Sequence, residues 1–213
     1  VGPAHTLAEE QAVVASLQSL FGTSAKTKLV AFDGDSITAG HNEATSLDER
    51  DLSWPYQMMM TIADGAVVAH NRAISSSVIV DTAGTPNKDL TDWAPEKLDA
   101  VLNAAYTKKI LVVMAGRNDI AVINAAGAGL TTYNRLVTYC QARKAAGWLK
   151  IIIVNAIPAK DLVTAGIDAE RTDYNSRITA NGLTDWDAVV DAAALNWQPG
   201  GSSDWSTNYQ GTI

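Results

Sequence analysis

The chain has 213 residues, of which 47% are hydrophobic, and it carries a formal net charge of −7. This length accommodates one well-buried globular domain and does not require two. The net negative charge argues against nucleic acid or an anionic membrane as a partner, since no basic patch stands out. No apolar run approaches the roughly 20 residues that a membrane span needs.

The first predicted element is a helix within the leading segment, residues 1–25. Thr6-Leu7-Ala8-Glu9 has the form of a capping box, apolar residues follow at helical spacing as far as Phe21, and Gly22 suits the end of a helix. No signal peptide is visible. The chain begins at Val1 rather than methionine, so we expect a processed or trimmed product.

Five short apolar runs predict strands, at residues 28–32, 66–69, 110–114, 151–154 and 188–190. Helical patterns alternate with them, at residues 54–63, 95–106, 132–146 and 168–179. Short apolar strands that alternate with helices are typical of a parallel sheet covered by helices on both faces. We therefore predict one three-layer α/β domain over residues 1–213, with a five-stranded parallel sheet and a loop after Asn196.

The one cysteine, Cys140, lies on the apolar face of the predicted helix 132–146. A single cysteine excludes an intrachain disulfide and a zinc site built from several thiolates, and its position favours a buried structural thiol. The carboxylates of residues 43–51 have a spacing that matches no calcium loop. We expect neither a metal nor an organic cofactor.

Polar residues follow three of the predicted strands at the point where each strand ends. Gly34-Asp35-Ser36 comes after the first strand, residues 70–77 come after the second, and Gly116-Arg117-Asn118-Asp119 comes after the third. Parallel strands end at the same edge of a sheet, where ligands bind in open α/β folds, so we expect these loops to converge. Gly34 permits a sharp turn there, and Asp35 offers a short acceptor that stabilises it.

This combination of side chains suits acyl transfer. Ser36 offers a hydroxyl that attacks a carbonyl, and the Asn118 amide together with main-chain N–H groups offers donors to the oxyanion. A turn or cap role is the ordinary alternative for either motif alone, but both motifs directly after buried strands favour the functional interpretation. Asp35 and Asp119 are expected to be structural, accepting backbone N–H bonds.

The loops resemble sequence blocks of the SGNH (GDSL-type) hydrolase family of lipases and esterases, and the resemblance covers most of the chain. Phe32-Asp33-Gly34-Asp35-Ser36-Ile37-Thr38 is similar to the first block, which implies that Ser36 is the nucleophile. Gly116-Arg117-Asn118-Asp119 is similar to the third block, which implies that Asn118 is a side-chain donor to the oxyanion. The resemblance also implies a flavodoxin-like sheet.

The second block is similar but changed at one position. Asn71-Arg72-Ala73-Ile74-Ser75-Ser76-Ser77 places Ser76 where the family usually has a glycine whose N–H enters the oxyanion hole. A serine retains the backbone donor, while its hydroxymethyl group narrows the approach. Further along, Tyr174-Asn175 and residues 186–191 resemble the later helix and the final strand of the family.

The fourth block departs from the family, which carries Asp-x-x-His before its last helix. In one alignment Asp204 is that aspartate and Thr207 replaces the histidine, which disables the base. In the other alignment the histidine comes directly after Ile213, and Gly211 stands where the aspartate is expected. We favour the second, a truncated C-terminal end, because the family closes its sheet with one more helix.

Two histidines follow the leading segment, and His70 is the candidate for a substitute base. His70 ends the second predicted strand and is interpreted as a rim or core histidine, because its own packing explains it. His41 lies in a polar loop and is interpreted as a solvated residue.

The sequence therefore predicts a serine esterase of the SGNH type that acts on small acyl esters, including O-acetylated carbohydrates. Ser36 is the nucleophile, Ser76 and Asn118 form the oxyanion hole, and Asp204 is the candidate acid. The alternative is a catalytically inactive SGNH-fold module that binds carbohydrate or serves a structural role and lacks the base. The oligomeric state stays open, and a secreted or extracellular location is favoured.

Overall fold

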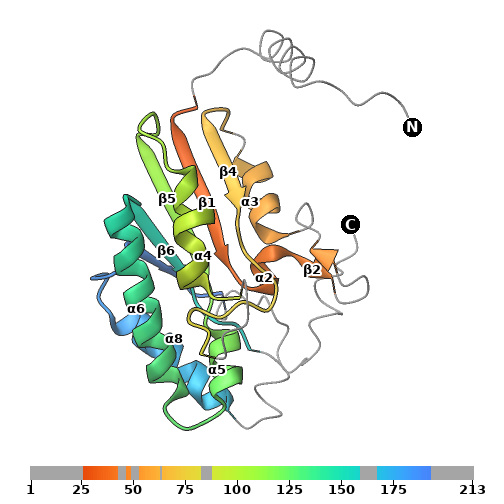
Figure 1. Ribbon diagram of the computed structural model, residues 1–213, viewed down its shortest axis with the longest axis vertical. Coiled ribbons are helices and arrows are strands. Elements are labelled where there is room, and N and C mark those ends of the chain that lie inside the picture. Colours follow the sequence, from red (N-terminus) through yellow and green to blue (C-terminus); the bar gives the residue numbers. More distant parts are fainter. Residues whose placement is uncertain are drawn as a thin grey trace.

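A computed structural model describes residues 26–42, 47–48, 53–62, 64–82, 88–158 and 167–192. The predicted leading helix, the loop after Asn196, and the candidate residues Asp204 and Thr207 lie outside these residues. Figure 1 shows the described part as a twisted sheet with helices packed along it.

Five strands form one parallel sheet, which confirms the predicted architecture. The strand order is β4-β1-β5-β6-β7, with bounds β1 (Lys28–Gly34), β4 (Val67–Asn71), β5 (Lys108–Met114), β6 (Lys150–Val154) and β7 (Ala188–Val190). Because the central strands are buried on both faces, nearly every position in them is apolar, and the sequence located all five within two residues at each end.

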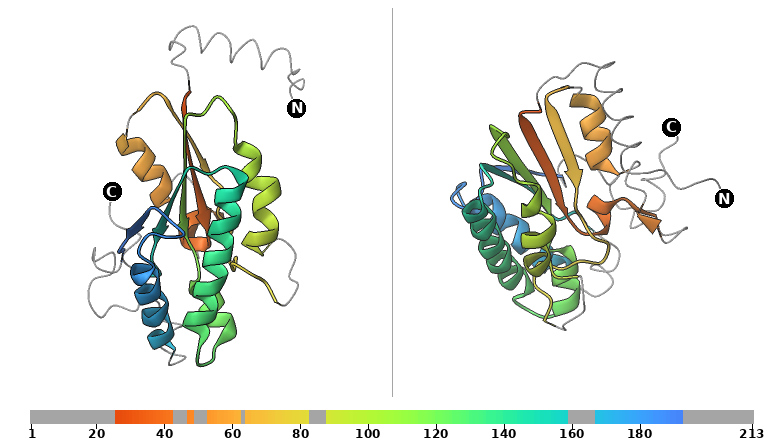
Figure 2. Two further views of the ribbon diagram at one scale, coloured as in Figure 1. Left: turned by 90° about the vertical axis from the view of Figure 1, so that its left-hand side faces the viewer. Right: turned by 45° about the horizontal axis from the view of Figure 1, so that its top comes forward.

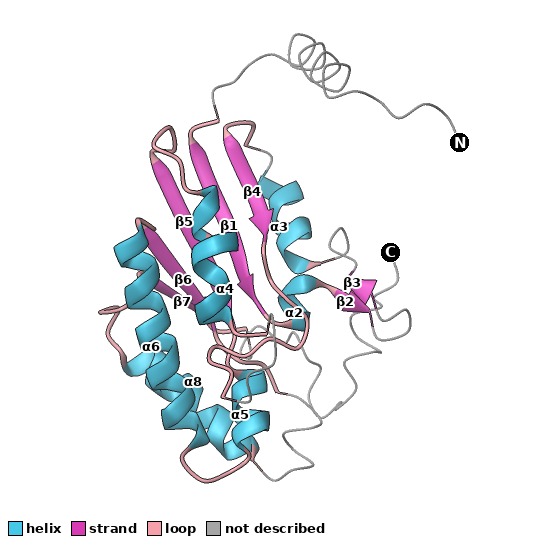
Figure 3. Cartoon of the chain, viewed as in Figure 1, coloured by secondary structure: helices cyan, strands magenta, loops and turns pink. Residues whose placement is uncertain are grey.

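Six helices, one short 3-10 turn and a pair of two-residue strands complete the described part, and Figure 3 labels the helices and the strands. Their bounds are α2 (Ser36–Ala39), α3 (Trp54–Ile62), α4 (Leu90–Lys97), α5 (Arg117–Ile123), α6 (Ala128–Ala146) and α8 (Asp168–Ala180), with a 3-10 turn η1 (Asp99–Val101) and an antiparallel pair β2 (His41–Asn42) and β3 (Leu47–Asp48).

The helices lie on the two faces of the sheet and make three layers, with α4 and α6 opposite α3 (Figure 2). The larger core cluster joins one face of the sheet to residues of α4, α6 and α8, including Leu90, Leu136 and Tyr174. The smaller cluster joins the other face to α3, where Trp54 meets Phe32 edge-on with ring centroids 5.4 Å apart. Successive side chains of each strand therefore pack into different core clusters, one on each face of the sheet.

The predicted helix 95–106 is wrong in its bounds. The observed helix α4 begins at Leu90, because the Asp89 carboxylate accepts the N–H groups of Thr91 (2.7 Å) and Asp92 (3.1 Å). Such an N-cap outweighs the preference of proline for the first turn, so Pro95 lies inside the helix.

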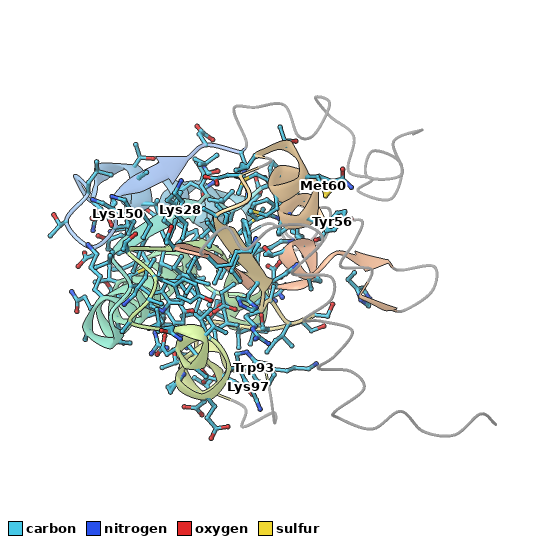
Figure 4. The ribbon with its side chains drawn as sticks, turned by 90° about the horizontal axis from the view of Figure 1, so that it is seen from above. Lys28, Tyr56, Met60, Trp93, Lys97 and Lys150 are labelled. Atoms are coloured by element: carbon cyan, nitrogen blue, oxygen red, sulfur yellow. The ribbon has the colours of Figure 1, made fainter. Side chains whose placement is uncertain are left out.

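Only the short η1 turn follows α4, so Leu98 is buried, and Val101 and Leu102 are partly buried, without a continuous helix. Lys97 instead reaches back over Trp93, with Nζ 5.7 Å from the ring centroid (Figure 4). This contact is of the cation–π type and covers the aromatic face at the helix surface.

Cys140 is fully buried in the larger core, as predicted for a structural thiol. Burial raises the pKa of the Cys140 thiol, so the group stays protonated and unreactive at neutral pH.

Three large apolar side chains of α3 are exposed: Tyr56 (43%), Met60 (63%) and Ile62 (46%). Figure 4 labels the first two. Among the described helices, none has the length and apolar character needed to cross a membrane.

The cap of α4 yields a stability prediction. Asp89→Ala removes the acceptor for two helix N–H groups and also for the Asp81 N–H (2.7 Å), so we expect a loss of about 1–2 kcal/mol of unfolding free energy in urea titrations. The control is Asp92→Ala, an exposed first-turn carboxylate of the same helix, which should change stability by less than about 0.5 kcal/mol. Equal losses in the two variants would contradict the capping role.

Candidate active site

The loops that carry the candidate residues leave the sheet at one edge. Strands β1, β4 and β5 run in the same direction, and the loops at their carboxyl ends gather near α2 and α5 (Figure 3). The register pairs Gly34 of β1 with Met114 of β5, so the segments beginning at Ser36 and at Gly116 start side by side. Ligands bind at this edge in open parallel sheets.

At Gly34 the end of β1 lies tightly against β5. The φ of this glycine is +148°, and a Cβ atom built there would lie 2.1 Å from the Met114 carbonyl oxygen and 2.9 Å from Thr38 Oγ1. No side chain fits in that space, so only glycine allows β1 to turn beside β5. The predicted sharp turn is therefore a packing requirement as well as a backbone one.

Asp35 and Ser36 form the start of the short helix α2. The Asp35 carboxylate accepts the Ile37 N–H (3.0 Å) as the N-cap, which is the structural role predicted for it. Ser36 is the first helical residue and is partly exposed, whereas Asp35 is buried. Burial raises the pKa of Asp35 to about 6.

The loop after β4 is tied to the end of β1 through one carbonyl group. The Gly34 oxygen accepts the Ile74 N–H (3.0 Å) and the Ser77 hydroxyl (2.9 Å). Ser76, between these two donors in sequence, is exposed and has a left-handed backbone with φ 62°.

The third loop joins the other two through Asn118. Its Nδ2 donates to the Ser77 carbonyl oxygen at 2.9 Å, and the side chain is partly buried in the first turn of α5. Gly116 makes this turn possible, because its φ is +104° and a Cβ there would lie 2.6 Å from the Tyr174 hydroxyl oxygen. Two hydrogen-bond steps thus connect Gly34, Ser77 and Asn118.

A model of the GDSL-like lipase/acylhydrolase family matches residues 32–210, from the last three residues of β1 almost to the end of the given sequence. The chain belongs to this family. A search of curated proteins found no match.

Solved structures with the same fold include acylhydrolases and esterases. The chain is similar to a carbohydrate acetylesterase family member from Sinorhizobium meliloti, with 17% identity over 78% of this chain and 84% of that one and a TM-score of 0.62. A lipase/acylhydrolase from Enterococcus faecalis is 16% identical over 81% of this chain and 80% of that one, with a TM-score of 0.59. An acetyl xylan esterase from Geobacillus stearothermophilus is 15% identical over 80% of this chain and 78% of that one, with a TM-score of 0.52. These identities establish the fold alone.

Within this GDSL-like fold, Asp119 has the structural role predicted for it. The carboxylate is fully buried and accepts the Ile79 N–H (2.8 Å) and an N–H of Arg135 (3.0 Å). It anchors the chain that follows the Ser76 loop to α5 and α6, and its acceptor sites are directed into the protein rather than toward the edge.

The two histidines of the described part lie inside strands. His70 pairs with Ala31 within the β4–β1 ladder, and burial followed by the nearby Arg72 charge lowers its pKa. His41 pairs with Asp48 in the β2–β3 ladder. Neither belongs to the three loops at the carboxyl edge.

The loop after β6 is held by α8, the helix that contains Tyr174 and Asn175. The Asn175 side chain accepts the Ala156 N–H (2.9 Å) and donates to the Ala156 oxygen (2.7 Å). Tyr174 donates to the Ala115 oxygen (2.9 Å) in the Asn118 loop. One helix, α8, therefore steadies two of the loops at this edge.

Sequence reasoning missed one polar residue of this GDSL-like site, Asp33. Its carboxylate is fully buried and accepts the Gly34 N–H (3.0 Å) and the Tyr139 hydroxyl. Burial raises the pKa of Asp33 to about 6. The available signal was a carboxylate at the end of an otherwise apolar strand, since such a group requires partners inside the protein.

The pKa of Asp35 predicts how stability depends on pH. A pKa raised from 3.8 to about 6 means that the folded state binds this proton more tightly, so the contribution to stability is lost as pH rises through about 6. Asp35→Asn keeps the capping oxygen and removes the charge. Its stability relative to wild type should therefore rise by about 2–3 kcal/mol between roughly pH 4 and pH 8 in urea unfolding.

The control for this measurement is Asp64→Asn. The Lys28 hydrogen bond lowers the pKa of Asp64, so this variant should lose stability relative to wild type as pH rises over the acidic range. A difference between Asp35→Asn and wild type that is flat with pH would contradict the assignment for Asp35.

Proposed function

We propose that this protein is a serine ester hydrolase of the SGNH type that cleaves small acyl esters, with O-acetyl groups on carbohydrates as the favoured substrate. Ser36 is the nucleophile, and Asn118 and the backbone N–H of Ser76 are donors to the oxyanion. The single observation that carries the proposal is the hydrogen-bonded connection of three strand-end loops through Gly34, Ser77 and Asn118.

The local structure around Ser36 supports its role as nucleophile. The Asp35 cap and the tight contact of Gly34 with β5 hold the turn on both sides of the hydroxyl, while Ser36 itself is partly exposed to incoming ligand. A nucleophile needs this combination of a rigid backbone and an accessible oxygen, because misplacement of the reacting atoms by about 1 Å costs on the order of a hundredfold in rate.

The oxyanion hole is supported by the second and third loops. The Nδ2 atom of an asparagine has two hydrogens to donate. Asn118 donates one of them to the Ser77 oxygen, and this hydrogen bond orients the second one toward a ligand. Ser76 has the left-handed backbone that glycine adopts readily, so the serine retains the main-chain donor at a cost of about 1–2 kcal/mol in backbone strain.

In the proposed reaction the Ser36 oxygen attacks the ester carbonyl, and a general base accepts its proton. The tetrahedral oxyanion takes hydrogen bonds from Asn118 and from main-chain N–H groups, the alcohol leaves with a proton from the base, and water then releases the acid. In the family pattern the base is a histidine three residues after an aspartate, and Asp204, the candidate acid, lies outside the described residues.

The substrate class is inferred from proteins of the same fold. One similar structure is a carbohydrate acetylesterase family member and another is an acetyl xylan esterase. A serine rather than glycine at position 76 narrows the space beside the oxyanion, which favours a small acyl group such as acetyl.

A second candidate function is a module of the same fold without catalysis, which binds carbohydrate or serves a structural role. Ser76 in place of glycine and Thr207 aligned with the family histidine favour it. The two candidates differ in one measurable property, the reactivity of Ser36.

The first test is covalent labelling of the full gene product, including whatever follows Ile213. A fluorophosphonate probe should label Ser36, located by peptide mass spectrometry, and the same protein should release acetate from acetylated xylan. Ser36→Ala should abolish both. Ser176→Ala, an exposed serine of α8, is the matched control and should change neither.

A folded wild-type protein that takes up no label and releases no acetate would refute the esterase. Retained binding of the same polysaccharide in that case would favour the carbohydrate-binding module.

Asn118→Ala tests the oxyanion hole. Loss of one such donor should lower kcat by about 10²- to 10³-fold with little change in KM, measured with a small aryl acetate. Asn134→Ala, an exposed asparagine of α6, is the control and should retain wild-type rates. A similar kcat for Asn118→Ala and wild type would contradict the role of Asn118 as a donor to the oxyanion.

A further inference from the structure

Asp33 is a carboxylate buried in the larger core, directly before the turn that carries Ser36. Asp33 follows Leu29 and Ala31 at every second position along β1, so it shares their face of the sheet and faces the layer of α4 and α6. Its side chain is inaccessible to solvent. Taking a carboxylate out of water costs several kcal/mol unless partners compensate for it, so its place at the end of a core strand requires a reason.

The partners of Asp33 come from both of its sides. One oxygen accepts the Gly34 N–H at 3.0 Å, and the other accepts the hydroxyl of Tyr139 from α6. Tyr139 is itself almost completely buried. A carboxylate that accepts two hydrogen bonds, one from the peptide ahead of it and one from a rigid helix, connects that peptide to the helix.

The connection extends further into the core. The Arg143 guanidinium lies 5.3 Å from the centre of the Tyr139 ring and pairs with Asp99 of η1 at 2.6 Å. The Trp148 indole also donates to Asp99, at 2.8 Å. Tyr139 is thus immobilised by a buried polar network, which makes it a rigid donor to Asp33.

Gly34 is consequently held at both ends of its backbone. Its N–H is bound by Asp33, and its carbonyl oxygen is bound by Ile74 and Ser77. The peptide planes that flank position 34 therefore have a defined orientation, and Ser36 follows two residues later.

We propose that Asp33 is a positioning residue for Ser36: held by Tyr139, its carboxylate orients the Gly34 peptide and, through it, the turn that presents the Ser36 hydroxyl. The inference rests on the proposed function in taking Ser36 as the nucleophile. Asp33 does not contact substrate, and its effect on the reaction passes through the backbone.

The protonation state of Asp33 connects this geometry to pH. Burial raises the pKa of Asp33 to about 6, while the Tyr139 and Gly34 hydrogen bonds and the Arg143 charge lower it and the Asp99 charge raises it. Below about pH 6 the group becomes neutral, and the Gly34 N–H loses its charged acceptor. Tyr139→Phe removes a donor that favours the carboxylate, so this variant should titrate at higher pH.

The direct test follows the Gly34 amide by NMR between about pH 4.5 and pH 8, a range that covers the expected titration. In wild type the Gly34 shift should titrate with a midpoint near 6, in Tyr139→Phe the midpoint should move upward, and in Asp33→Asn the titration should vanish. The control is Tyr133→Phe, which removes another bonded hydroxyl of α6 that accepts from Asn181 and should leave the midpoint unchanged. A Gly34 amide that does not titrate in wild type would overturn the proposal.

The functional readout is the rate of fluorophosphonate labelling at Ser36, at about pH 8, where a catalytic histidine is neutral. Asp33→Asn should label about tenfold to a hundredfold more slowly than wild type, Tyr139→Phe should fall between them, and Tyr133→Phe should match wild type. Folding of each variant is checked by its thermal unfolding midpoint.

The two proposals fail in different ways. Labelling of Asp33→Asn and Tyr139→Phe at the wild-type rate would overturn the positioning role and leave the esterase intact. Absence of labelling in wild type would refute the esterase, and the Gly34 titration would still decide whether Asp33 holds the turn.

Discussion

The candidate site depends on one contact, the approach of Gly34 to the neighbouring strand β5. A side chain at this position would overlap the Met114 carbonyl oxygen, and the Gly34 carbonyl is in turn the acceptor for both Ile74 and Ser77. The close approach brings the ends of β1 and β5 together, and the shared acceptor brings the loop after β4 to the same place. Asn118 then has the Ser77 oxygen within reach.

The same edge concentrates buried carboxyl groups. Asp33, Asp35 and Asp119 are all inaccessible or nearly so, and burial raises the pKa of each. Asp33 accepts a backbone N–H at the end of β1, Asp35 accepts one at the start of α2, and Asp119 accepts one from the loop after β4. These buried carboxyl groups lower the stability of the folded state at neutral pH, and they also fix the backbone geometry where ligands bind. Functional sites typically combine these two effects.

Much of the fold could be predicted because its signals are local. Strands such as 110–114 and 151–154 are apolar at every position, and a parallel sheet places the residues after them at one edge. Ser36, Ser76 and Asn118 could for this reason be predicted to lie in loops at that edge, while their roles in catalysis stay predictions. The helix predicted at 95–106 was wrong because Leu98 and Leu102 pack against the core outside any long helix. Apolar spacing indicates which residues face the core rather than the backbone conformation.

The sequence by itself determined the fold class, the family resemblance and the edge at which chemistry is expected, since all three follow from residue types and their order along the chain. Only the tertiary structure decided which distant groups meet. Tyr139 lies 106 residues from Asp33 and Asn118 lies 41 residues from Ser77, and no periodicity encodes such pairs. They form because the α6 layer and the twist of the sheet bring those side chains together, and these depend on the packing of the whole core.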